Sequence, residues 1–180
     1  MKYSVFNGNV IDIEASGLGP NGYPIEVGIV LGNGESYEAL VAPHQDWQHW
    51  DAEAEALHGI TRAELERHGR PPSEICAELN ALCRNRTLYS DCWVLDAPWL
   101  TKLYASAGMN QAFHVSPMEA LVDDELLVHW NAMKHQYSRC AQIPPHRALN
   151  DAIIISETLE RLVVSSSHRM TAGLPLAASA

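Results

Sequence analysis

The stretch Val10-Ile11-Asp12-Ile13-Glu14 decides how the fold of this chain is predicted. Apolar and acidic residues alternate in it, and the glycine-rich segment 16–22 follows. Alternation with a period of two indicates a β-strand, in which successive side chains point to opposite faces. We therefore expect a strand that begins near Tyr3 and ends by presenting Asp12 and Glu14 on one face.

The next segments predict two further strands and an antiparallel meander. Residues 25–31 and 35–41 are rich in β-branched and apolar residues, and Gly32-Asn33-Gly34 between them is typical of a tight hairpin turn. Strands joined by such short turns pair in antiparallel fashion. The first part of the fold is thus predicted to be a three-stranded meander.

Beyond the meander, helical and extended patterns alternate. Helices are expected at 51–57, 61–68 and from 71 to Leu82, then in a segment opened by Asp96-Ala97-Pro98, at 119–137, and after 144–146. Short strands are expected at 87–92 and 113–115. A meander followed by alternating helices and strands predicts an α/β fold with a central mixed five-stranded sheet flanked by helices.

Length and composition predict a single domain. The chain has 180 residues and 47% hydrophobic content, enough for one substantial core. We expect the domain at residues 1–164 and a Ser/Ala-rich tail at 165–180 that is disordered or only weakly docked. No apolar stretch is long enough to span a membrane, and the N-terminus lacks the layout of a secretory signal.

The lack of a membrane-spanning apolar stretch and of a secretory signal predicts a soluble, cytoplasmic protein with no membrane partner. The four cysteines show no CxxC spacing, and three of them lie in apolar segments, so free buried thiols are expected. Free thiols fit a reducing compartment.

The formal net charge of −10 argues against a broad basic surface for nucleic acid. Composition alone therefore does not suggest a nuclease. The objection weakens if several acids are metal ligands, because the bound cations then face the phosphate. Scattered arginines are usually solvated, although four could contact phosphates: Arg62, Arg67, Arg70 and Arg147.

The two carboxylates of the first strand need an explanation, because like charges side by side on one face repel. A bound divalent cation, which prefers oxygen ligands, would offset the repulsion between Asp12 and Glu14. The alternative is that both acids simply lie on the solvated face of an edge strand.

Three later residues extend the candidate site, each with a simpler alternative. Asp96 lies where a strand gives way to a helix, where an acid is also favoured as a cap, and Asp91 competes with it. His146 and Asp151 flank the start of the last helix. Taken alone, His146 could equally be an ordinary surface residue.

In chain order, these acids resemble the motifs of the DnaQ-like exonucleases of the DEDDh type, in the ribonuclease H-like superfamily. The resemblance covers residues from about Tyr3 to Val164, and its three motifs here are Ile11-Asp12-Ile13-Glu14-Ala15-Ser16-Gly17-Leu18, Asp96-Ala97-Pro98-Trp99-Leu100 and His146-Arg147-Ala148-Leu149-Asn150-Asp151-Ala152.

The second motif departs from the family. The family commonly has His-Asn upstream of a Phe-Asp pair, whereas this chain has Ser90-Asp91 upstream of Leu95-Asp96. The difference concerns the substrate side of the site, so no substrate preference is carried over.

The resemblance implies a ribonuclease H-like fold and a metal-dependent 3′–5′ exonuclease that removes nucleoside monophosphates. It implies two Mg²⁺ or Mn²⁺ ions held by Asp12, Glu14, Asp96 and Asp151, with Asp12 bridging them and His146 as the base. An imidazole is a workable base near neutral pH. The implied partner is single-stranded or short DNA or RNA with a free 3′ end, and a homodimer is implied as one option.

The resemblance also places a pocket for the chain end around the first motif. Backbone groups would meet the 3′-hydroxyl, Leu18 would wedge against the last base, and His58 and Ile60 would line the other side; the implied substrate contacts are Ala15, Ser16, Gly17, Leu18, His58 and Ile60. For Leu18 and Ile60 the alternative is core packing. Trp47 and Trp50 are candidates for base stacking, while Trp93, Trp99 and Trp130 are expected in the core.

Two other functions stay open at this point. One is a catalytically silent member that binds nucleic acid or a protein, which the retention of all the acids and His146 disfavours. The other is a metal-dependent phosphoesterase acting on small nucleotides, which the acidic composition would suit. The sequence does not separate DNA from RNA, because that choice depends on how the site treats the 2′-hydroxyl.

Overall fold

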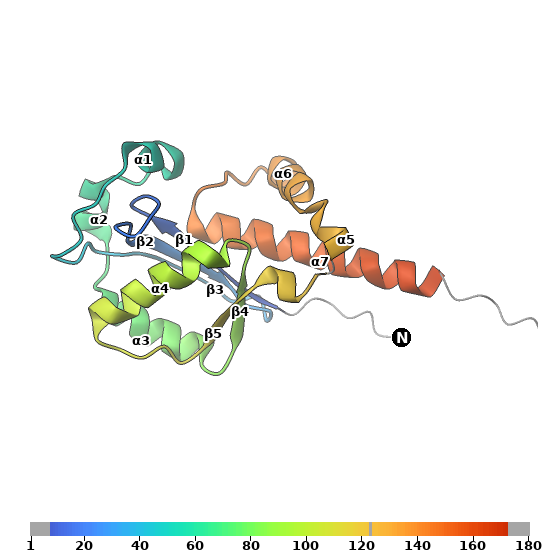
Figure 1. The fold of residues 1–180 in the computed structure, drawn as a ribbon, viewed down its shortest axis with the longest axis horizontal. Helices are drawn as coiled ribbons and strands as arrows, with labels where there is room; N and C mark the ends of the chain where they lie inside the picture. Colours follow the sequence, from blue (N-terminus) through green and yellow to red (C-terminus); the bar gives the residue numbers. More distant parts are fainter. Residues whose placement is uncertain (1–7, 123, 173–180) are drawn as a thin grey trace, which may run out of the picture.

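The structure is a computed structural model that describes residues 8–122 and 124–172. Its strands form one mixed sheet in the order β3-β2-β1-β4-β5 (Figure 1), with β1 at Asn9–Ala15, β2 at Pro24–Val30, β3 at Ser36–Leu40, β4 at Thr87–Ser90 and β5 at His114–Pro117. The first three strands pair in antiparallel fashion, and β1, β4 and β5 pair in parallel. The predicted mixed five-stranded sheet with an antiparallel meander is confirmed.

Helices cover both faces of this sheet (Figure 1). Helix α4 packs against one face with α3 beside it, and α7 packs along β1 and β2 on the other face with α6 beside it. The helical segments are α1 (Ala52–His58), α2 (Arg62–His68), α3 (Pro72–Cys83), α4 (Trp93–Ala107), the 3₁₀ turn η1 (Met118–Ala120), α5 (Asp124–Leu127), α6 (Trp130–Ala141) and α7 (Ala148–Ala172).

The central strand β1 faces two separate cores, as its alternation predicts. Ile11 and Ile13 belong to the core on the α3 and α4 side, whereas Val10 belongs to the core with α7. Since side chains alternate along a strand, Asp12 and Glu14 share the face of Val10 and point toward α7. The fold therefore brings both acids to the start of α7.

Helix α4 begins earlier than predicted. The expected start at Asp96 is wrong, because the carbonyl of Cys92 accepts the N–H groups of Leu95 and Asp96 and closes a turn before Asp96. Strand β4 accordingly ends at Ser90, before the predicted Cys92. Asp96 thus lies within the first turn of α4 and not at its cap.

The predicted single helix at 119–137 is also wrong, since η1, α5 and α6 divide this region. Its buried residues Met118, Val122, Leu126 and Trp130 recur every four positions. In one continuous α-helix, each such step turns about 40° beyond a full turn, so the four side chains would spread over about 120° of the helix surface. Breaking the helix keeps all of them against α7.

The last helix is longer than predicted, because α7 continues past residue 164 to Ala172. Of the two expectations for the segment from residue 165, disorder is wrong up to Ala172, since extending an existing helix costs little. Residues 173–180 lie outside the described residues, and the division into domain and tail stays a prediction.

The described residues bear on two expectations from the sequence, one on membrane spans and one on the cysteines. No helix among them is both long and apolar enough to cross a membrane. All four cysteines are free; Cys76 and Cys83 are buried, Cys92 is partly buried and Cys140 is exposed.

Candidate metal and catalytic centre

The structure brings the predicted acids and His146 together around one cavity of about 440 Å³. Strand β1 contributes Asp12 and Glu14, and the first turn of α4 contributes Asp96. The loop before α7 contributes His146, and the first turn of α7 contributes Asp151. Segments more than 130 residues apart in the chain therefore meet at one place.

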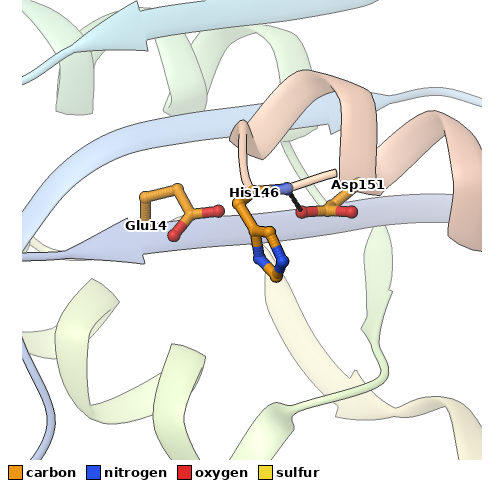
Figure 2. A group of neighbouring side chains, drawn as sticks. All are labelled: Glu14, His146 and Asp151. Atoms are coloured by element: carbon orange, nitrogen blue, oxygen red, sulfur yellow. Dashed lines mark hydrogen bonds between the residues drawn. The ribbon is translucent and has the colours of Figure 1, made fainter. Parts of the chain in front are cut away.

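Glu14, His146 and Asp151 form the tightest group in this cavity (Figure 2). One potential ligand atom from each lies within 4.8 Å of the others. The backbone N–H of His146 donates to Asp151 Oδ2 at 2.7 Å, and His146 adopts a left-handed backbone with φ of 66°. In the view of Figure 2, the imidazole lies between the Glu14 and Asp151 carboxylates.

Asp96 is almost completely buried, at 2% exposure, and is held by Ser90. The Ser90 hydroxyl donates a short hydrogen bond to Asp96 Oδ2 and also accepts the N–H of Cys92. Burial raises the pKa of Asp96 to about 7, although the Ser90 hydrogen bond opposes the rise. Ser90, which precedes Asp91 in the sequence, thus orients a candidate metal ligand.

The carboxylates of the cavity crowd one another. Loss of hydration raises the pKa of Asp12 well above its usual range, and the charges of Asp96, Asp151 and Glu14 raise it further. The pKa of Glu14 is raised to about 7 by burial and then by Asp151 and Glu26. Burial also raises the pKa of Asp151, against the hydrogen bond from the His146 N–H.

This donor set fits a hard divalent cation. Mg²⁺ and Mn²⁺ prefer carboxylate oxygens, and a bound cation would favour the ionised forms that burial and the neighbouring charges disfavour. The described side chains at the cavity supply only one lysine and no arginine against five acids: Asp12, Glu14, Asp91, Asp96 and Asp151. The residues present therefore suit a metal centre chemically.

A half-buried ion pair that the sequence did not predict fixes the start of α7. Glu26 lies opposite Glu14 on β2 and is fully buried. Arg147 Nε donates to its two carboxylate oxygens at 3.0 and 3.1 Å, Arg147 Nη2 donates at 2.5 Å, and the Ala148 N–H donates at 2.8 Å. A glutamate in the apolar run Pro24–Val30 was the available signal, since a buried carboxylate requires a partner. Arg147 is thus engaged by protein and is not a free phosphate contact.

A second ion pair lies on the cavity wall. Asp91, the competitor of Asp96, accepts hydrogen bonds at Oδ2 from Lys134 Nζ and from Trp130 Nε1, the latter at 3.3 Å. Both Asp91 and Lys134 line the cavity. No signal in the sequence singled out Lys134, because its partner lies 43 positions away.

A second cavity lies at the segment where the pocket for the chain end is predicted. A cavity of about 280 Å³ adjoins the acidic one, shares Glu14 and Trp99 with it, and is lined by four of the predicted contacts: Ala15, Gly17, Leu18 and His58. Leu18 is 70% exposed at its rim, so the core alternative does not hold for it. Ile60 is fully buried in the core, and core packing accounts for it.

Ser16 is also directed inward. Its side chain is buried, its hydroxyl accepts the N–H of Tyr23, and it hydrogen-bonds with His49 at 3.3 Å. The structure therefore places the Ser16 side chain behind the wall of the second cavity, where it supports the turn.

His58 is the most distinctive polar group of the second cavity. Its Nδ1 accepts the N–H of Ile60 at 3.0 Å, so the neutral ring carries its proton on Nε2. Burial lowers the pKa of His58, which favours this neutral form. Within the described residues, Nε2 is buried and has no hydrogen-bond partner. His58 thus holds an unsatisfied donor next to this cavity.

The tryptophans are distributed differently from the prediction. Trp47 is buried and stacks on Tyr23 at a centroid distance of 5.0 Å, so its predicted role in base stacking is wrong. Trp93 is 39% exposed and is not a core residue. Trp130 is buried as predicted, and Trp99 lines both cavities.

No protein-family model and no curated protein matches the chain. Solved structures do match, among them E. coli exonuclease I in complex with a dA16 oligonucleotide, with a TM-score of 0.68 at 14% identity over 90% of this chain. The zinc-bound complex of E. coli exonuclease I with single-stranded DNA gives a TM-score of 0.69 at 14% identity over 90% of the chain. Exonuclease I in its apo form gives 0.64 at 12% identity over 92%.

The chain spans less than half of these larger proteins, 41%, 41% and 47% of their lengths in the same order. At this level of identity, the likeness concerns the fold. It confirms the predicted ribonuclease H-like α/β fold.

Proposed function

We propose that the protein is a DnaQ-like, DEDDh-type 3′–5′ exonuclease that releases nucleoside monophosphates from single-stranded or short DNA or RNA. The observation that carries the proposal is the meeting of Asp12, Glu14, Asp96, Asp151 and His146 around one cavity. The likeness in fold to exonuclease I, solved with a dA16 oligonucleotide, supports the nucleic-acid substrate.

The four carboxylates would hold two Mg²⁺ or Mn²⁺ ions, with Asp12 at the centre of the set. When bound, such ions stabilise negative charge at phosphorus and lower the pKa of a coordinated water. The chain's part is to hold its oxygens in place, and hydrogen bonds from the chain fix two of the four carboxylates. Ser90 holds Asp96, the His146 N–H holds Asp151, and Glu26 anchors the helix start that carries Asp151.

In the hydrolysis, a water oxygen attacks the phosphorus that joins the last two nucleotides. His146 takes the proton of that water, since its partly exposed ring lies at the cavity beside Glu14 and Asp151. The bond from phosphorus to the 3′-oxygen of the upstream nucleotide breaks, and that oxygen leaves and is protonated. The products are a nucleoside 5′-monophosphate and a chain one nucleotide shorter.

The second cavity gives the reaction its preference for a chain end. A terminal nucleotide there would lie against Trp99 and Leu18. The free Nε2–H of His58 would donate to one of its oxygens. The second cavity shares only Glu14 and Trp99 with the acidic cavity. The phosphate on the 5′ side of the terminal nucleotide would therefore face the carboxylates of the acidic cavity.

The deciding experiment follows 3′- and 5′-labelled single-stranded DNA and RNA with Mg²⁺, Mn²⁺ or EDTA. Stepwise shortening from the 3′ end that needs metal, and that Asp12→Asn and His146→Ala abolish, is the expected result. Binding of polymer without any cleavage would instead indicate a silent binding protein. Cleavage of mononucleotide esters alone would indicate a phosphoesterase.

The cytoplasmic location and the homodimer are further proposals. Cell fractionation would test the location, and sedimentation equilibrium would test the oligomeric state.

A further inference from the structure

Lys134 contributes the single lysine or arginine side chain among the described residues that line the acidic cavity. It projects from α6, and its side chain is 24% exposed. An isolated ammonium in a recess lined by five carboxylates could serve merely to reduce repulsion. Its contacts argue for a more specific role.

Asp91 holds the Lys134 ammonium in a defined position. The Asp91 side chain is only 11% exposed, and the same oxygen, Oδ2, accepts from both Lys134 and the indole of Trp130. The ammonium also lies 5.9 Å from the centre of the Trp130 ring. Burial alone would lower the pKa of Lys134, but the charge and hydrogen bond of Asp91 raise it, so the lysine stays charged.

The Asp91 contact leaves donors available. An ammonium has three N–H groups, and the bond to Asp91 occupies one of them. The partly exposed group lines the cavity, so a ligand there can reach the remaining donors. Because the side chain is already ordered, binding a ligand would cost little further rotamer entropy.

The two cavities suggest which part of a substrate would meet this lysine. The cavity for the terminal nucleotide is bounded by α1, and the acidic cavity by α6; only Glu14 and Trp99 line both. Helices α1 and α6 lie on opposite sides of the start of α7 (Figure 1). A strand whose last nucleotide lies by α1 would therefore continue toward α6.

We propose that Lys134 binds a backbone phosphate of a single-stranded substrate on the 5′ side of the scissile bond, and that Asp91 positions it for that contact. This inference rests on the proposed function and adds a specificity residue to it. It assigns a role to Asp91, where the chain departs from the family. It also supplies one phosphate contact to a protein whose net charge is −10.

The test measures binding and not turnover. A short 5′-fluorescein-labelled oligo-dT is titrated with His146→Ala protein in Ca²⁺, and anisotropy is followed at several KCl concentrations. Adding Lys134→Met should weaken binding about tenfold and make the slope of log K against log salt shallower by about 0.7, the value for one lost phosphate contact on a single strand. Lys134→Arg should keep the slope.

Two controls separate a phosphate contact from a structural role. Arg139→Met removes one positive charge from the exposed side of the same helix, outside the cavity, and should leave affinity and slope unchanged. Asp91→Asn with Lys134→Met keeps the net charge and leaves no unpaired Asp91 carboxylate, and it should still bind weakly with the shallower slope.

The outcomes are distinguishable. If the wild-type protein shortens DNA but Lys134→Met binds like Arg139→Met, the lysine inference is wrong and the exonuclease proposal stands. If the double variant regains full affinity and slope, Lys134 serves only the fold. If the wild-type protein neither binds nor shortens any polymer, the proposed function fails, and this inference fails with it.

Discussion

Arg147 reaches from the start of α7 to Glu26 on β2 and donates three hydrogen bonds to its carboxylate. The arrangement is asymmetric, because the Glu26 side chain is fully buried whereas that of Arg147 is 39% exposed. His146 immediately precedes Arg147, and Asp151 lies one turn beyond it. The ion pair thus fixes the helix start that carries two candidate catalytic residues.

This asymmetry predicts unequal effects of removing each partner. Arg147→Met leaves a buried carboxylate without its cation and should lower the free energy of unfolding by about 3 kcal/mol. Glu26→Gln should cost less, about 1 to 2 kcal/mol, because the exposed guanidinium can turn to water. Urea denaturation in EDTA measures both. Equal losses would contradict the assignment, and exposed Arg139→Met should change stability by less than about 0.5 kcal/mol.

Gly28 predicts a second, steric effect at the same junction. A Cβ added there would lie 2.1 Å from the carbonyl carbon of Ala148, which is backbone and cannot yield easily. Gly28→Ala should therefore cost about 3 kcal/mol or more and also weaken Mn²⁺ binding, since the helix start must move. Gly34→Ala has open space around it and should cost only its left-handed backbone strain, about 1 kcal/mol. Similar losses in both variants would contradict close packing of β2 on α7.

The fold was largely predictable because its signals are local. The alternation around Asp12 and Glu14, the turn at residues 32–34 and the capping residue Thr61 each depend on neighbours within a few positions. The Thr61 hydroxyl indeed accepts the Glu64 N–H at 3.1 Å. The division of the segment after β5 was missed because its cause is the shared core with α7, which the local pattern does not contain.

Only the acids and the histidine of the site could be predicted from the sequence. The acids and His146 could be named from their motifs, but their supports could not. Glu26 finds Arg147 at a separation of 121 positions, and Asp91 finds Lys134 at 43. Such pairs follow from the packing of whole elements, and a single sequence does not encode them in its periodicity.

The crowded carboxylates predict how the metal-free protein responds to pH. The pKa values of Glu14 and Asp96, each about 7 in the folded state, lie above those of unfolded glutamate and aspartate. At these two sites the folded state therefore binds more protons, so their contribution to stability is greatest at low pH and falls as pH rises toward 7. We expect a loss on the order of 2 kcal/mol between about pH 5 and pH 8 in EDTA.

Mn²⁺ should reverse this trend, because it binds the ionised form and stabilises the folded protein most at the higher pH. Urea denaturation across the same pH range, with and without Mn²⁺, measures the effect. Asp96→Asn should flatten the metal-free profile in part. Stability that rises with pH in EDTA would contradict the raised pKa values of these acids.

His58 predicts a change in substrate affinity without a change in the chemical step. His58→Asn keeps an acceptor for the Ile60 N–H, in place of Nδ1, but removes the unpaired Nε2 donor. KM for a short oligonucleotide should rise about tenfold, the effect of about 1.4 kcal/mol in binding, while kcat stays within about threefold. Steady-state kinetics on labelled oligonucleotides measure this. A fall in kcat at constant KM would place His58 in the chemistry instead.

His146 requires a test that separates a base from a metal ligand, because the geometry permits both: one atom each of Glu14, His146 and Asp151 lies within 4.8 Å of the others. If His146 is the base, His146→Ala should lower kcat by about 100-fold or more and change the Mn²⁺ affinity by less than about threefold. Asp151→Asn should lower both, since it removes a proposed ligand. Calorimetric Mn²⁺ titration beside single-turnover kinetics decides between the roles. A loss of Mn²⁺ affinity in His146→Ala as large as that in Asp151→Asn would make His146 a ligand, and the proton would then need another acceptor.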